Sequence, residues 1–174
     1  SWTNDQTSIG LAASGTGNIA AFTVTNVTTA PVVSTITVTP HFLNSVTCDG
    51  PTKTFTITVN PTGQVNDPAD QVVCNGASTT LVPFSTNNTG GTTTYSWTNN
   101  TISIGLGASG FGDIAAFTAI NNGTAPVTAT ITVTPHFLNS VNCNGPAQTF
   151  TITVNPTGQV DQPANQVVCN NTST

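Results

Sequence analysis

The stretch TITVTPHFLNSV decides the fold of this chain, and it occurs twice, at residues 35–46 and again at residues 130–141. Its first residues alternate threonine with isoleucine and valine, which is the period of a β-strand that buries one face and exposes the other. A second stretch, TFTITVNPTGQV, alternates in the same way and also occurs twice, at residues 54–65 and 149–160. Both stretches therefore predict strands, with polar or Pro-containing turns between them.

The two copies belong to one long internal repeat. When the sequence is shifted along itself by about 95 positions, about 58 of the 79 overlapping pairs are identical. Residues 80–95 have no counterpart, so the chain starts inside one repeat and stops just inside a third. Such self-similarity at a fixed period is the signature of a tandem array of domains.

The linkers of this array are predicted where Pro and Gly follow a strand, in NPTGQ at residues 60–64 and 155–159. Residues 65–159 are then one complete repeat of about 95 residues, long enough to bury a core of its own. Residues 1–64 are the C-terminal two thirds of one repeat, and residues 160–174 begin the next. Because residues 1–64 lack front strands of their own, we expect them to fold poorly unless a neighbour supplies them.

Composition predicts an all-β fold with essentially no helix. The chain has no Met, Glu or Arg and a single Lys, and these are the residues that make exposed helix faces. Several short strands per repeat, separated by Gly, Asn and Pro turns, favour an immunoglobulin-like β-sandwich. The one tryptophan of each repeat, Trp2 and Trp97, is interpreted as a core residue between the sheets, with a surface platform for sugars as the alternative.

Charge excludes several classes of function. The formal net charge is −5 with one Lys, so no basic patch exists for nucleic acid or for an acidic membrane surface. No apolar run approaches the length of a transmembrane helix.

The four cysteines, two per repeat, are too far apart in sequence for a zinc site and predict disulfides in an oxidising compartment. Pairing Cys74 with Cys143 would close one repeat internally, and Cys48 and Cys169 would then pair with neighbouring repeats. Pairing Cys48 with Cys74 and Cys143 with Cys169 would instead connect neighbouring repeats across each linker. We favour the internal pairing, because each repeat then carries its own bridge.

No catalytic constellation is predicted, and we expect no enzyme. His41 and His136 occupy one repeat position, and no Asp or nucleophile motif lies near them in the sequence. No cofactor is predicted either. Calcium at the first linker, bound by Asn66, Asp67 and Asp70, is the alternative, but the second linker carries less charge.

Six segments follow one another in the complete repeat: QVVCNGASTT (71–80), YSWTNN (95–100), SIGLGASG (103–110), DIAAFTA (113–119), PVTATITVTP (126–135) and GPAQTFTITVNP (145–156). In their order and spacing they resemble the PKD-like repeat of very large secreted and cell-surface proteins of Bacteroidota. The resemblance implies a sandwich repeat in long extracellular arrays associated with adhesion, surface filaments or gliding.

We therefore expect a structural repeat of a bacterial surface fibre, filament or adhesin stalk, acting as a rigid spacer and assembly unit. Its partners would be further copies of the repeat, within one chain or as a polymer. The alternative is a multivalent carbohydrate- or surface-binding module. His41, Phe42, His136 and Phe137 are the candidate contacts in either case, with a neighbouring unit or with a ligand.

Overall fold

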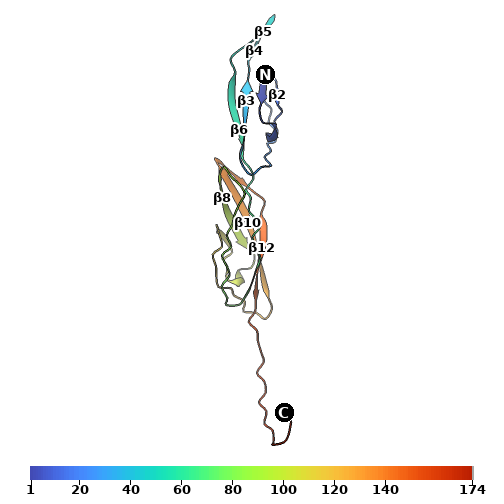
Figure 1. The fold of residues 1–174 in the computed structure, drawn as a ribbon, viewed down its shortest axis with the longest axis vertical. Coiled ribbons are helices and arrows are strands. Elements are labelled where there is room, and N and C mark those ends of the chain that lie inside the picture. Colours follow the sequence, from blue (N-terminus) through green and yellow to red (C-terminus); the bar gives the residue numbers. More distant parts are fainter. Residues whose placement is uncertain (174) are drawn as a thin grey trace.

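The computed structural model describes residues 1–173; Thr174, the last residue of the predicted third segment, lies outside the described residues. The fold is all-β, and the only helical elements within residues 1–173 are two single 3-10 turns, Thr7–Ile9 and Ile102–Ile104. We call residues 1–64 the N-terminal unit, residues 65–159 the C-terminal unit and residues 160–173 the tail. The two units lie end to end, and the tail extends away from the C-terminal unit (Figure 1).

The C-terminal unit contains one large sheet. Its strands lie in the order β7-β12-β10-β8-β9, and β11 also pairs with β10. Strand β7 is parallel to β12, whereas all other pairs in this sheet are antiparallel. The bounds are β7 Gln71–Cys74, β8 Thr92–Asn99, β9 Ser109–Phe111, β10 Val127–Asn139, β11 Val141–Asn144 and β12 Gln148–Asn155.

A second, less regular layer covers this sheet. Residues 77–84 and 113–119 run antiparallel to each other and are joined by isolated bridges between Ser78 and Thr118 and between Val82 and Ile114. The apolar side chains of both layers form one core. The arrangement is consistent with a β-sandwich, with one extended sheet and one short layer.

The predicted alternation explains which face is buried. Along β10 every second residue is buried, and Ala129, Ile131 and Val133 have no exposed surface. Trp97 lies in the core of this unit and faces Gly110 on β9. A Cβ on Gly110 would lie 2.3 Å from Cζ2 of Trp97, so only glycine leaves room for the indole ring there.

The N-terminal unit repeats part of this sheet. Its four-stranded sheet has the order β2-β1-β3-β6, and β4 and β5 form a separate hairpin. Its core is smaller and contains Trp2, Ile9, Leu11, Ile36 and Val59. The bounds are β1 Trp2–Asn4, β2 Ser14–Gly15, β3 Val32–Val38, β4 His41–Asn44, β5 Val46–Asp49 and β6 Lys53–Val59.

The identical sequence 35–46 and 130–141 takes two forms. In the C-terminal unit it belongs to one continuous strand, because residues 92–95 of β8 pair with residues 135–138. In the N-terminal unit β3 ends at Val38 and β4 begins at His41. Among the described residues β4 pairs only with β5, and no segment lies beside it as residues 92–95 lie beside residues 135–138.

One asparagine in each unit holds a loop: Asn121, which is buried, and Asn26, which is half-buried. Asn121 has 4% of its surface exposed, and its amide donates to the carbonyls of Ala125 and Val154 while its oxygen accepts from the Gly123 amide. Asn26 makes the equivalent bonds to Ala30 and Val59. These asparagines begin Asn-x-Thr or Asn-x-Gly turns, and their amides satisfy carbonyls that would otherwise be buried without partners.

Candidate functional site

The histidine of the C-terminal unit connects three strands. His136 lies on β10, opposite Asn144 of β11. Its Nε2 lies 2.8 Å from Oγ of Ser96 on β8, and its Nδ1 lies 2.7 Å from Oδ1 of Asn144. The ring therefore fixes the β10–β11 hairpin to β8.

The equivalent histidine of the N-terminal unit has an aspartate beside it, which the sequence prediction missed. His41 Nε2 lies 2.8 Å from Oγ of Ser1, and its Nδ1 lies 2.5 Å from Oδ1 of Asp49. The prediction that no Asp lies near this histidine is wrong, because the hairpin register places His41 directly opposite Asp49, eight positions away.

Serine, histidine and aspartate are thus joined in the order of a catalytic triad, but their surroundings differ from those of one. The carboxylate of a triad is buried and stabilises the imidazolium that forms during the reaction. Here the side chain of Asp49 is 64% exposed and that of His41 is 36% exposed, and the second unit has Asn144 in place of the aspartate. A neutral amide cannot supply that charge, so the feature common to both units is a hydrogen-bonded cross-link.

The two phenylalanines next to the histidines differ completely in exposure. Phe137 has 0% of its surface exposed, whereas Phe42 is 70% exposed. A Cβ on Gly91 would lie 2.4 Å from Cζ of Phe137, so the chain at Gly91 covers this ring. Among the described residues, no segment covers Phe42 as the chain at Gly91 covers Phe137, and the Phe42 ring is exposed.

The C-terminal hairpin also holds the linker. The Gly63 amide donates to the Cys143 carbonyl over 3.1 Å, and a Cβ on Gly63 would lie 2.7 Å from the Pro135 oxygen. Gly145 lies against the same segment, since a Cβ there would lie 1.6 Å from the Gly63 oxygen. Two glycines facing each other thus allow the linker and the hairpin to touch through their backbones.

An amide pair closes the edge of this joint. Asn60 Nδ2 donates to the Asn139 carbonyl over 2.8 Å, and Asn139 Nδ2 donates to Oδ1 of Asn60 over 3.1 Å. On another side of the joint, Asn88 accepts from the Gln64 amide and donates to the Thr62 carbonyl. We call this arrangement the linker clamp; it comprises residues 60–64 held by the hairpin 135–145 and by the loop 86–91.

Loop 86–91 extends the clamp onto the N-terminal unit itself. The Thr89 amide donates to the Thr29 carbonyl over 2.9 Å, and Gly90 lies against the Pro31 ring. Sequence reasoning did not identify the clamp, although a signal was present. Asn60, Gly63, Asn139 and Gly145 all recur unchanged at the equivalent repeat positions.

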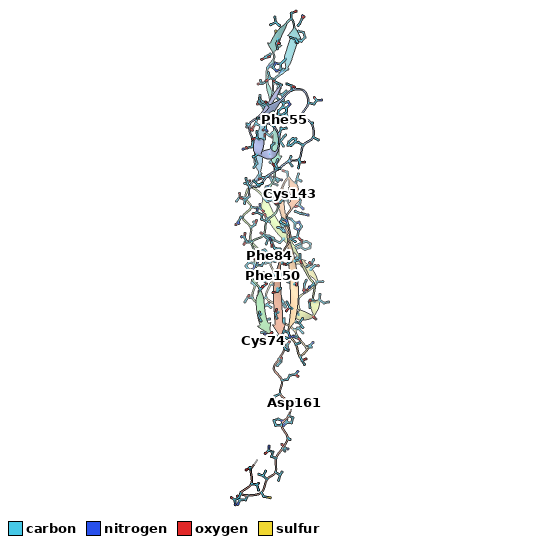
Figure 2. The ribbon with its side chains drawn as sticks, turned by 90° about the vertical axis from the view of Figure 1, so that its right-hand side faces the viewer. Phe55, Cys74, Phe84, Cys143, Phe150 and Asp161 are labelled. Carbon is cyan, nitrogen blue, oxygen red and sulfur yellow. The ribbon has the colours of Figure 1, made fainter. Side chains whose placement is uncertain are left out.

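The cysteines are free and lie far from the predicted partners. Cys74 and Cys143 are at opposite ends of the C-terminal unit (Figure 2). Cys74 pairs with Asn155 at one end of β12, and Cys143 pairs with Phe137 near the other end of β10. Roughly ten residues of strand separate these ends, or about 33 Å, whereas a disulfide needs Cα atoms within about 7 Å. This fold therefore does not accommodate the favoured Cys74–Cys143 pairing.

The fold does not bring together the cysteines of the alternative pairings within one chain either. Cys48 lies in the β4–β5 hairpin, at the far end of the N-terminal unit from the C-terminal unit, and Cys169 lies in the tail (Figure 1). Neither Cys48 with Cys74 nor Cys143 with Cys169 is adjacent. The sequence could not reveal this, since spacing does not indicate which end of a unit each cysteine occupies.

Two of the three residues considered for calcium, Asn66 and Asp70, already have other partners. Asp70 Oδ1 accepts from the Thr151 amide over 2.6 Å, and the Asn66 side chain donates to Ser85 Oγ. Within residues 1–173, no three His, Cys, Asp or Glu side chains are grouped as metal ligands would be. Asp70 instead attaches the chain before β7 to β12.

No helix within residues 1–173 is long and apolar enough to cross a membrane. Comparison with known proteins gave no match to a family model, to a curated protein or to a solved structure.

Proposed function

We propose that this chain is a structural segment of an extracellular fibre, filament or adhesin stalk, in which each unit of about 95 residues is a rigid spacer and an assembly unit. In this proposal the units are immunoglobulin-like sandwiches of the PKD-like type, arranged in tandem. The bacterial surface location, and an origin in Bacteroidota, rest on the sequence resemblance given above. The partners are further copies of the repeat, and no enzymatic activity or cofactor is proposed.

The observation that carries the proposal is the linker clamp. A flexible linker would allow the units to move independently, which is the default for domains joined by a small interface. Here four of the five linker residues, Asn60, Thr62, Gly63 and Gln64, form backbone or side-chain hydrogen bonds with the hairpin or with loop 86–91. A spacer needs this property, because force or position is transmitted along an array only through stiff joints.

The alternative of a carbohydrate-binding repeat finds no support in the aromatic residues. A sugar platform requires an exposed ring in every unit. Trp97 and Phe137 are both buried in the complete unit, at 9% and 0% exposure, and the exposed Phe111 of that unit is replaced by Thr16 in the N-terminal unit, so no exposed ring recurs at one repeat position in both units. We therefore retain the structural proposal alone.

The test of the proposal is the stiffness of the joint. In Gly145→Ala the new Cβ must displace the linker from the hairpin, so small-angle X-ray scattering should change from a single elongated shape to a distribution of bent shapes. Gly50→Ala is the matched control, because a Cβ there meets only the Pro40 ring at 2.9 Å and no linker. A wild-type chain that already samples many bent shapes would contradict the proposal.

A further inference from the structure

The first and last strands of the C-terminal unit are neighbours and run in the same direction. Strand β7 pairs with β12 in parallel, with Gln71 opposite Ile152 and Cys74 opposite Asn155. Every residue of this pair lies inside the complete repeat, residues 65–159. The contact between the two strands therefore belongs to the unit itself.

The chain enters and leaves this unit at opposite ends. The linker 60–64 precedes β7 at the end that faces the N-terminal unit, and the tail follows β12 at the other end (Figure 1). Cys74, the last residue of β7, lies at the end where the tail leaves (Figure 2). Tension along the chain therefore pulls β7 toward the N-terminal unit and β12 away from it, so the two strands are drawn past each other along their lengths.

The direction of pulling decides how the hydrogen bonds between two strands are loaded. Parallel strands are joined by evenly spaced, slanted hydrogen bonds. When the strands are drawn past each other, all of these bonds are stretched at once and must break together. When the strands are pulled apart from one shared end, the bonds break one after another, which requires less force. Tension along this chain loads the β7–β12 pair in the first way.

Hydrogen bonds from flanking residues secure both ends of the short strand β7. Before it, Asp70 Oδ1 accepts from the Thr151 amide over 2.6 Å. After it, the Asn75 backbone amide donates to the Asn155 carbonyl over 2.8 Å, and Asn75 Nδ2 donates to Oγ1 of Thr157 over 3.1 Å. These bonds also oppose lengthwise sliding, because each joins the segment around β7 to β12 or to the residues that follow it.

The rest of the sheet holds β12 more firmly than β7 does. Residues 148–154 of β12 pair with β10, and the side chains of Phe150, Ile152 and Val154 belong to the core. Strand β7 has four residues, and of these Val73 packs against the core. The β7–β12 pair joins the two points at which the chain is pulled, so its separation is the step that limits unfolding under tension.

We propose that the β7–β12 pair is the contact that resists unfolding of the unit when the chain is under tension, and that the Asp70 side chain is part of this contact. The inference rests on the proposed structural function, since a spacer in a fibre or stalk transmits tension along its chain. Forced unfolding is governed by the rate of unfolding and not by the free energy of unfolding. The resistance therefore depends on the direction of pulling, which stability alone does not.

The experiment changes the direction of pulling and leaves the fold unchanged. In the full chain, with the four native cysteines replaced by serine, DNA handles are attached at Asp67→Cys and Gln159→Cys, and optical tweezers pull β7 and β12 from opposite ends. In the second variant the handles are attached at the native Cys74 and at Gln159→Cys, so the strands are pulled apart from one end. Asp67, Cys74 and Gln159 are exposed, and chemical denaturation checks that both variants are equally stable.

We expect the first geometry to require a several-fold higher unfolding force than the second at the same loading rate. Equal forces, or a higher force in the second geometry, would overturn the inference. If the joint between the units is still stiff by scattering, the proposed spacer function survives that failure.

The role of Asp70 is tested in both geometries. Asp70→Ala should lower the force only in the first, because in the second the bond to Thr151 lies at the far end of the pair and is loaded last. Asp70→Asn is the matched control, since it retains a side-chain oxygen and has the residue found at the equivalent position, Asn165, so most of the force should remain. An equal loss in both geometries for Asp70→Ala would overturn this role, because a contribution to stability alone would explain it.

Discussion

The N-terminal and C-terminal units share most of their residues but differ in what those residues bury. Phe137 and Phe150 are fully or almost fully buried, whereas Phe42 and Phe55 are 70% and 47% exposed. The cause lies in residues 65–95, which supply β7, one of the two segments of the short second layer (residues 77–84) and the first half of β8 to the C-terminal unit. Burial of these phenylalanine side chains therefore depends on the segment that precedes the repeated strands, and not on the repeated strands themselves.

The largest expected difference in stability between the two units arises from removal of an aromatic side chain. Phe150 contacts Phe84, with ring centroids 6.5 Å apart, whereas no residue equivalent to Phe84 faces Phe55 in the described chain. Phe150→Ala should lower the free energy of unfolding of the C-terminal unit by about 4 kcal/mol. Phe55→Ala should cost the N-terminal unit only about 1–2 kcal/mol, because half of that ring is already in water.

Residue-resolved amide hydrogen exchange by NMR would measure both losses separately. It is preferable to peptide-based exchange, since the two units yield identical peptides. Equal losses in the two units would mean that the N-terminal unit is covered by a partner under the conditions used.

A smaller effect is expected at the equivalent asparagines Asn121, which is buried, and Asn26, which is half-buried. Asn121→Ala leaves the carbonyls of Ala125 and Val154 without a donor, and should cost about 2–3 kcal/mol. Asn26→Ala removes the same bonds from a more exposed loop and should cost less. Chemical denaturation followed by NMR would compare them; an Asn26 loss larger than the Asn121 loss would contradict the burial argument.

The smallest expected effect is a pH dependence of stability that involves Tyr95 of the C-terminal unit. Burial is the largest cause that raises the pKa of Tyr95 above its ordinary value of 10.0, and the nearby Asp113 acts in the same direction. A raised pKa means that the folded state retains the proton longer, so this contribution to stability is complete below pH 10 and is lost as the pH rises through the folded pKa.

Tyr95 is the only tyrosine, so this alkaline loss should affect the C-terminal unit alone. Denaturation midpoints between pH 9 and 11 should fall more steeply for the wild type than for Tyr95→Phe. Parallel slopes for the two proteins would show that the phenol contributes nothing.

Much of the local structure was predictable because it depends on neighbours two positions apart. The alternation in TITVT placed a strand at residues 35–39 and at 130–134, and the tryptophans were assigned to the core where they are found. The Pro-Gly segment 60–64 was predicted to be a linker directly after a strand, and it does follow β6, but its sequence did not indicate that it is clamped.

The contacts that decide the candidate site join residues that are far apart in sequence. Asn60 meets Asn139 across 79 positions, and Asp70 meets Thr151 across 81 positions. Even the short pairing of His41 with Asp49 depends on the register of a hairpin, which the composition of the turn did not reveal. The internal disulfide was favoured for the same reason, since spacing along the chain carries no information on which end of a unit a cysteine occupies.

The sequence by itself determined the period of the repeat, the strands of its two alternating stretches and the absence of a basic surface, because each follows from residue order or composition alone. Only the tertiary structure decided which edges are covered. One identical stretch is a continuous buried strand at residues 130–139 and a strand followed by an exposed hairpin at residues 35–44. The physical reason is that a strand satisfies its backbone hydrogen bonds and buries its apolar face only against another segment, and that segment is specified elsewhere in the chain.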